Sequence, residues 1–161
     1  MTLQATDAVG NSSEPSSRLA ESSISNDMGF LLAKLHAAGS VLNNAALAEF
    51  GLKERSYSVL ALACSDLGPT QRELADFLSL DPSQIVALID ELEQRGLVER
   101  KAGVSDRRQK LVAATPEGRK VHAAAQEAAN AAEARQLGML TTQEVASLRS
   151  ILRKAVWAET P

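Results

Sequence analysis

The sequence predicts a mainly helical protein with one small β-hairpin, a mainly α fold of the α+β type. Aromatic residues make up only 3% of the 161 residues while 45% are hydrophobic, so we expect an aliphatic, alanine-rich core, which favours helices. Most of the chain after residue 24 repeats its apolar residues with helical spacing. One stretch, residues 96–118, alternates instead and carries the densest positive charge in the sequence.

A tail and a long helix are expected at the N-terminus. Residues 1–23 are rich in serine and lack apolar periodicity, so we predict that they are disordered. We expect Ser25 or Asn26 to be the N-cap of a helix that continues to Phe50. A continuous seam of apolar residues runs along this helix: Leu31, Leu35, Ala38, Leu42 and Ala45. Such a seam faces either a partner helix or the core of the same subunit.

Two shorter helices should follow. The first covers about residues 54–66 and ends at the Leu-Gly-Pro of residues 67–69, because glycine and proline break helices. Thr70 opens the second, since Thr70 and Glu73 fit a capping box in which each side chain accepts a hydrogen bond from the other residue's amide. Its predicted buried face consists of Leu74, Phe77 and Leu78.

The fourth helix has clear start and stop signals. Asp81 is the expected N-cap with Pro82 in the first helical position, and Gly96 is a suitable C-terminal stop. The apolar residues of this helix form a single stripe: Ile85, Leu88, Ile89 and Leu92. The tight Ser-Leu-Asp turn at residues 79–81 therefore separates two helices, as in a helix-turn-helix.

Residues 97–102 and 109–115 are predicted to pair as a β-hairpin around turn residues 103–106. Eight Lys or Arg fall between Arg95 and Lys120 against three acids, a local balance of 8 − 3 = +5 in a chain of net charge −3. A cationic hairpin on an acidic protein is typical of nucleic-acid contact, since sequence-independent binding to DNA places Lys and Arg against phosphate.

Two further helices are expected after the hairpin. Thr115 and Pro116 start an alanine-rich helix that continues to about Arg135. Thr141 and Glu144 form a second capping box at the start of the last helix. A helix-turn-helix followed by a basic hairpin is the arrangement of a winged helix-turn-helix.

With that order of elements, the segments TQRELADFLSLDPSQIVALIDELEQRGLVER and DRRQKLVAATPEG resemble the MarR family of dimeric winged-helix transcription regulators, over about residues 25–157. The family's Asp-x-Arg wing signature is met by Asp106 and Arg108, and its downstream Thr and Gly by Thr115 and Gly118. The usual Leu before that Thr is Ala114 here. The resemblance implies one domain over residues 24–161, with dimerisation helices at 24–51 and 116–158 and a winged-helix DNA-binding part at 54–115.

The resemblance further implies that a homodimer places two recognition helices in successive major grooves of a pseudo-palindromic operator. Arg108 is then the wing residue that enters the minor groove, and Asp106 braces the wing tip by pairing with a neighbouring Arg. Arg107 and Lys110 are the next candidates for phosphate contact. The amides around Thr70 and Gln71, at a helix start, are a further phosphate site.

The predicted helix-turn-helix is acidic, with two Arg against six Asp or Glu between Thr70 and Gly96, a balance of 2 − 6 = −4. We expect most of these acids to point away from phosphate. Val86 and Ala87 are small and apolar where family members commonly carry Thr or a basic residue, so base reading is left to Ser83 and Gln84. Gln84 can pair bidentately with adenine, while Val86 or Ala87 can only contact a thymine methyl group.

Two other residues suggest regulation. Cys64 would carry an alternative function, a cysteine-based redox-sensing regulator, although a thiol among Leu62, Ala63 and Leu67 is expected to behave as a small hydrophobe. His36 is a weak candidate for contact with an anionic effector. A different class remains open: the acidic helix-turn-helix also suits a winged-helix protein-interaction module without specific DNA binding.

No catalytic constellation, metal-ligand spacing or cofactor motif is recognised in the sequence, so we expect neither an enzyme nor a bound cofactor or metal. The absence of a membrane-length apolar run, of a signal peptide and of a second cysteine leads us to expect a cytoplasmic protein. The sequence therefore predicts a homodimeric, DNA-binding transcriptional repressor that a small-molecule effector releases from its operator.

Overall fold

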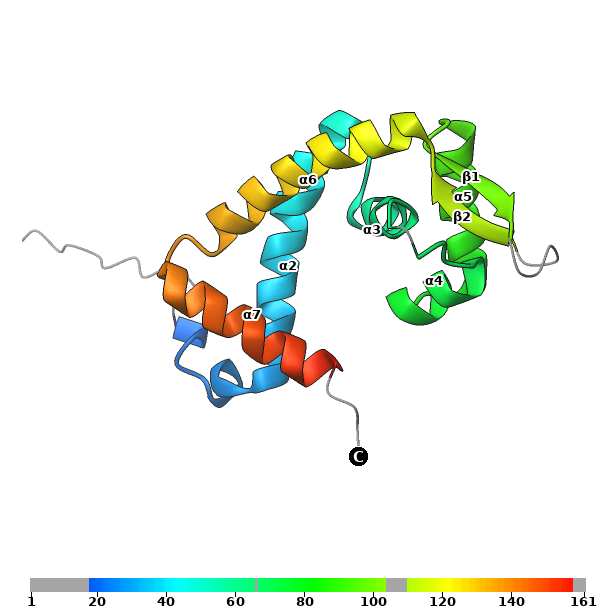
Figure 1. Ribbon diagram of the computed structural model, residues 1–161. Helices are drawn as coiled ribbons and strands as arrows, with labels where there is room; N and C mark the ends of the chain where they lie inside the picture. The colour runs from blue at the N-terminus through cyan, green and yellow to red at the C-terminus, as the bar shows by residue number, and fades with distance from the viewer. Residues whose placement is uncertain (1–17, 66, 104–109, 158–161) are drawn as a thin grey trace, which may run out of the picture. The chain divides into compact units, whose positions relative to one another are not determined.

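The computed structural model describes residues 18–65, 67–103 and 110–157. The chain divides into two compact units, residues 1–37 and 38–161. Most of the predicted tail, residues 1–17, lies outside the described residues. Figure 1 shows the helices and the short hairpin that make up the fold.

The first unit contains a short 3-10 helix, η1 (Ser23–Asn26), and the beginning of α2 (Met28–Leu47). The carboxylate of Asp27 accepts a hydrogen bond from the amide of Phe30 at 2.9 Å, which is the N-cap contact of α2. The prediction that Ser25 or Asn26 caps this helix was therefore wrong, because both residues belong to the 3-10 turn that precedes it.

In the second unit, α2 ends in a 3-10 turn, η2 (Ala48–Phe50), closed by Gly51 in the left-handed conformation at φ 61°. Helix α3 (Glu54–Ala63) is shorter than the predicted 54–66. Its end is set by Ser65, whose amide and hydroxyl both donate to the carbonyl of Leu62, at 3.2 Å and 2.6 Å. A serine bonded three residues back replaces the regular helical pattern.

The helix-turn-helix consists of α4 (Gln71–Leu78) and α5 (Pro82–Gln94). Thr70 and Glu73 form the predicted capping box, and Asp81 is the N-cap of α5 with Pro82 in its first turn. Between the helices Ser79 adopts a left-handed conformation at φ 52°, which closes the tight turn. The start and stop signals read from the sequence are confirmed here.

The wing is a two-stranded antiparallel sheet of β1 (Val98–Ala102) and β2 (Lys110–Ala114). Its register pairs Val98 with Ala114 and Ala102 with Lys110. Strand β1 lies beside α5, and β2 lies beside α3, α4 and the start of α6. The two long helices that follow are α6 (Pro116–Gln136) and α7 (Thr142–Trp157).

One aliphatic core holds α3, α4, α5 and the wing together. Its fully buried side chains come from each of these elements, from the end of α2 and from the segment before α3: Leu47, Leu52, Val59, Leu60, Leu74, Ile85, Ile89, Leu92, Val98 and Val112. Phe77, predicted to be buried, is instead 55% exposed, and its ring stacks on that of Trp157 with centroids 5.2 Å apart. Helix α4 buries Leu74 and Ala75, so its inward side is rotated away from Phe77.

The wing is joined tightly to α6. The Thr115 hydroxyl donates to the carbonyl of Gly96 at 2.7 Å and accepts from the amide of Gly118 at 3.0 Å. A β-carbon at Gly118 would collide with the carbonyl of Leu97. The Thr and Gly that match the family pattern therefore let the first turn of α6 pack directly on the chain that enters the wing. Among the described residues, no helix has the length and apolar character needed to cross a bilayer.

Candidate nucleic-acid interface

Helix α5 has one buried and one exposed side. Ile85, Ile89 and Leu92 are fully buried. The four residues that the sequence predicts to face bases are all exposed on the same helix: Ser83, Gln84, Val86 and Ala87. A helix held by its apolar side with its first turn exposed is the geometry that a major groove accepts.

The first turn of α5 is fixed by its cap. The carboxylate of Asp81 accepts hydrogen bonds from the amide of Ser83 at 2.8 Å and from its hydroxyl at 2.5 Å. These hydrogen bonds hold the pKa of Asp81 below its usual value. The Ser83 oxygen can still accept a hydrogen bond from a base, but its proton is already donated within the protein.

The start of α4 is held against the wing, because the amide of Val112 donates to the carbonyl of Pro69 at 2.8 Å. The amide of Thr70 donates to Glu73 Oε2 at 2.7 Å, and this bond together with that of the Thr70 hydroxyl lowers the pKa of Glu73. A phosphate at this helix end would therefore bind amides other than that of Thr70, beside a carboxylate. The side-chain oxygen of Gln71 accepts from Arg100 Nε at 3.4 Å.

The wing tip carries the remaining candidates. Lys110 is exposed at the first position of β2. Asp106, Arg107 and Arg108 lie outside the described residues, so their predicted roles in bracing the tip and contacting DNA stay predictions.

Several cations counted in and around the hairpin are engaged within the protein. The guanidinium of Arg95 donates to the carbonyls of Phe50 and Gly51 at 2.6 Å and 2.7 Å, and thus links the end of α5 to the end of η2. Arg119 donates to the carbonyl of Cys64 at 2.7 Å. Further contacts are the ion pairs Lys101–Glu99, Lys120–Glu117 and those of Arg100 with Asp90 and Glu93. Because Asp90 and Glu93 lie outside the counted stretch, the local balance of +5 overstates the charge available to DNA.

Acids of the helix-turn-helix also have local partners. Glu73 and Asp81 cap helices, and Asp76 lies 3.9 Å from Arg72 across one helical turn. Asp90 and Glu93 both bind Arg100, which lies on β1. In the sequence, Arg100 was counted only as one cation of the hairpin. The signal that could have predicted its ion pairs is a basic residue on a strand that follows an acidic helix.

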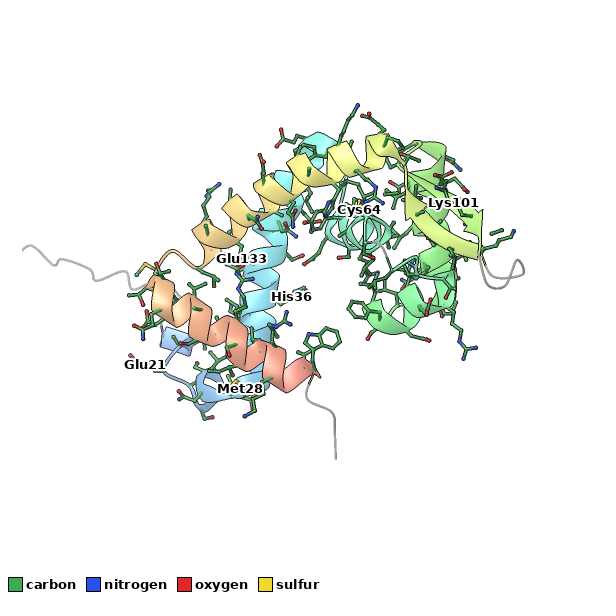
Figure 2. The ribbon with its side chains drawn as sticks, in the orientation of Figure 1. Glu21, Met28, His36, Cys64, Lys101 and Glu133 are labelled. Atoms are coloured by element: carbon green, nitrogen blue, oxygen red, sulfur yellow. The ribbon has the colours of Figure 1, made fainter. Side chains whose placement is uncertain are left out.

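Cys64, at the end of α3, lies beside α6 in Figure 2. Burial raises the pKa of its thiol, an effect that the nearby Arg119 only partly offsets. A raised pKa reduces the thiolate fraction and hence the reactivity toward oxidants, which disfavours the redox-sensing alternative. Nearby, the rings of Tyr57 and His122 stack with centroids 5.7 Å apart.

The exposed His36 lies on the part of α2 that belongs to the first unit (Figure 2). Its contact with an anionic effector stays a prediction. Over the parts of the chain that the structure describes, no three His, Cys, Asp or Glu side chains are arranged to hold a metal ion.

A helix-turn-helix with an exposed second helix, followed by a two-stranded wing, defines a winged-helix DNA-binding protein. Comparison with known sequences gives its family. The MarR family pattern matches residues 52–110. The HTH-type transcriptional repressor Rv2887 of Mycobacterium tuberculosis is 30% identical over 127 residues, which cover 79% of this chain and 91% of the relative. The chain belongs to the MarR family of transcriptional regulators.

Solved structures of the family share the fold. CouR from Rhodococcus jostii RHA1, bound to p-coumaroyl-CoA, superposes with a TM-score of 0.77 at 43% identity and covers 86% of this chain and 97% of its own. Rv2887 in complex with p-aminosalicylic acid gives a TM-score of 0.68 at 29% identity, over 80% of this chain and 97% of its own. The protein is thus a DNA-binding transcriptional regulator with the winged-helix fold.

Proposed function

We propose that the protein is a cytoplasmic homodimeric repressor that binds a pseudo-palindromic operator and leaves it when a small molecule binds. The observation that carries this proposal is the arrangement of side chains on α5. One side of the helix is buried in the core, and the first two turns expose four side chains: Ser83, Gln84, Val86 and Ala87. Gln84 would read adenine through two hydrogen bonds, and Val86 or Ala87 would contact a thymine methyl group.

The wing would supply the second contact. Because the helix-turn-helix is acidic and carries the apolar Val86 and Ala87 where polar contacts are common, recognition would depend on the wing residues Arg107, Arg108 and Lys110. Arg108 would enter a narrow minor groove, where the enhanced negative potential favours a guanidinium. Asp106 would keep the wing tip in shape.

The terminal helices support a dimer. Helix α7 has no buried residue, although it carries a stripe of aliphatic side chains. Ile151 and Val156 on that helix are 65% and 63% exposed. An uncovered apolar stripe of this kind suits burial against a second copy of the chain, and an isologous dimer would space two recognition helices for two half-sites.

The ligands of the similar structures indicate the class of effector. CouR binds p-coumaroyl-CoA and Rv2887 binds p-aminosalicylic acid, and both ligands contain an aromatic acid or its thioester. We propose an effector of the same class for this protein. It would act by preferring a spacing of the two recognition helices that no longer fits the grooves.

Selection from a pool of random duplexes tests this proposal. The protein should enrich one sequence with two-fold-related half-sites and bind it far more tightly than a scrambled duplex. Salicylate and p-coumaroyl-CoA, each titrated into the complex, test the effector class by release of the labelled duplex. Failure to enrich any sequence would favour the protein-interaction alternative, because a module without specific DNA binding selects none.

Arg108→Ala tests the wing. The variant should bind the selected duplex about tenfold more weakly, since it loses one charged groove contact, and should stay folded and dimeric. Fluorescence anisotropy gives the affinity and sedimentation gives the mass. Equal affinity of variant and parent would remove the minor-groove role from Arg108.

A further inference from the structure

The side chain of Arg100 connects three elements of the DNA-binding part. Its Nη2 lies 2.5 Å from Asp90 Oδ1, and its Nη1 donates to Glu93, both on α5. Its Nε donates to Gln71 Oε1 on α4 at 3.4 Å. The backbone amide of Arg100 donates to Glu93 Oε1 at 3.2 Å, so strand β1 itself is tied to the recognition helix.

This guanidinium is directed into the protein. The side chain of Arg100 is only 18% exposed, whereas those of Asp90 and Glu93 are 49% and 41% exposed. A planar guanidinium has donors for two carboxylates and an amide at once, which a lysine ammonium cannot match with the same fixed geometry. Arg100 also offsets one of the two negative charges that Asp90 and Glu93 place on the helix that must approach a polyanion.

The geometry points to Arg100 as a positioning residue for sequence recognition, an inference that rests on the proposed operator binding. Asp90 lies seven residues, about two helical turns, after Ser83. Clamping this half of α5 to β1 and to Gln71 fixes the tilt of the helix relative to the wing and α4. The tilt decides whether Ser83 and Gln84 reach the base edges while the wing stays in its own groove.

A direct phosphate contact by Arg100 makes a different prediction. A phosphate contact contributes equally to any duplex, so its loss weakens specific and non-specific binding by the same factor and reduces the salt dependence of both. A positioning residue contributes only where base edges are read. Its loss weakens binding to the selected duplex and leaves binding to scrambled DNA almost unchanged.

Arg100→Met tests the assignment, because methionine keeps much of the aliphatic stem and removes the donors. Affinities for the selected and the scrambled duplex are measured by anisotropy over a salt series, at a temperature where circular dichroism shows each variant fully folded. We expect about a tenfold loss for the selected duplex and less than about a twofold change for the scrambled one, with an unchanged salt slope. Two results would overturn the assignment. One is an equal loss of affinity for both duplexes together with a slope of log affinity against log salt that is smaller by about one. The other is no loss of affinity for either duplex.

Lys101→Met is the matched control, since Lys101 is the next residue on the same strand, carries the same charge and pairs with Glu99 at 2.9 Å. The affinities of this variant for the selected and for the scrambled duplex should change by the same factor. The double variant Asp90→Asn/Glu93→Gln removes the acids and keeps Arg100, so it tests the clamp even if Arg100→Met fails to fold. It should also lose discrimination between the duplexes; full discrimination would refute the clamp. A parent protein that fails to discriminate would instead count against the proposed function.

Discussion

The winged-helix region and the last helix of this chain differ in how they bury their apolar residues. Between Leu52 and Ala114 the aliphatic side chains of α3, α5 and the wing close on one another, and many are fully buried. Helix α7 carries an aliphatic stripe of which no residue is fully buried: Val145, Leu148 and Leu152 are half-buried, and Ile151 and Val156 are exposed. The DNA-reading part is thus complete within one chain, whereas the last helix has an apolar surface that the proposed dimer would cover.

This difference suits the winged-helix region and the last helix to different roles. A part with a closed core can hold Ser83 and Gln84 at fixed positions, as base reading requires. In the proposed dimer, terminal helices that pack against a second copy could change the distance between two such readers without unfolding either of them. The proposed effector would need just that property.

A matched pair of isoleucine truncations should give the largest difference between the two regions. Ile89→Ala removes a fully buried side chain from α5 and should reduce the free energy of unfolding by about 2 to 5 kcal/mol. Ile151→Ala, at a position 65% exposed in one chain, should mainly weaken the dimer. Denaturant unfolding at several protein concentrations and sedimentation equilibrium measure the two effects. If both variants lost the same free energy of unfolding and neither weakened the dimer, the proposed difference between the winged-helix core and helix α7 would be wrong.

Gly118→Ala tests the joint between the wing and α6. The added methyl group would meet the carbonyl of Leu97, so the backbone must move, at a cost of about 1 to 3 kcal/mol. Thermal unfolding of this variant beside Glu117→Ala, an exposed neighbour in the same helical turn, measures the cost. A melting temperature equal to that of the neighbour variant would show that the close approach is unimportant.

Thr115→Ala should have a smaller effect at the same joint. It removes the hydroxyl that accepts from Gly118 and donates to Gly96, and the loss of a helix cap costs about 1 kcal/mol. Thr115→Ser keeps the hydroxyl and should recover most of the stability in the same denaturant titration. No difference between the alanine and serine variants would contradict the capping role.

The smallest expected effect is a pH dependence at the contact of α3 with α6. Burial lowers the pKa of His122, so the folded protein holds this proton less tightly than the unfolded chain does. Stability from the neutral ring is present above the unfolded pKa of about 6.5 and is lost as the pH falls through the folded value. His122→Phe keeps a ring against Tyr57 and should flatten the decline in stability below about pH 6.5 in denaturant titrations. If the stability of the variant fell with pH as much as that of the parent, groups other than His122 would be responsible for the decline.

The parts of the fold that the sequence predicted correctly depend on neighbours in the chain. The box of Thr70 with Glu73 and the cap at Asp81 involve residues two or three positions apart, so the pattern contains the whole interaction. The hairpin was also predicted locally, from its alternating residues and the turn residues between the two strands. The family resemblance added the Asp-x-Arg signature, which no local rule specifies. The roles of Asp106 and Arg108 remain predictions.

What the sequence did not reveal depends on packing between distant elements. Arg100 meets Asp90 because β1 lies beside α5, and Arg95 reaches the carbonyl of Phe50 across 45 positions of the chain. A count of charges treats these cations as available to DNA. Phe77 was misplaced for a similar reason, since the helical period of a helix as short as α4 leaves its inward side poorly determined.

One measurement tests the central claim, that two self-contained reading parts act together on one operator through a dimer. The affinity of the protein for the selected duplex is compared with that for the same duplex after one half-site is scrambled. We expect a loss of at least about a hundredfold, because one of the two linked reading parts then loses its specific contacts while the other keeps them. Equal affinity for the two duplexes would contradict it.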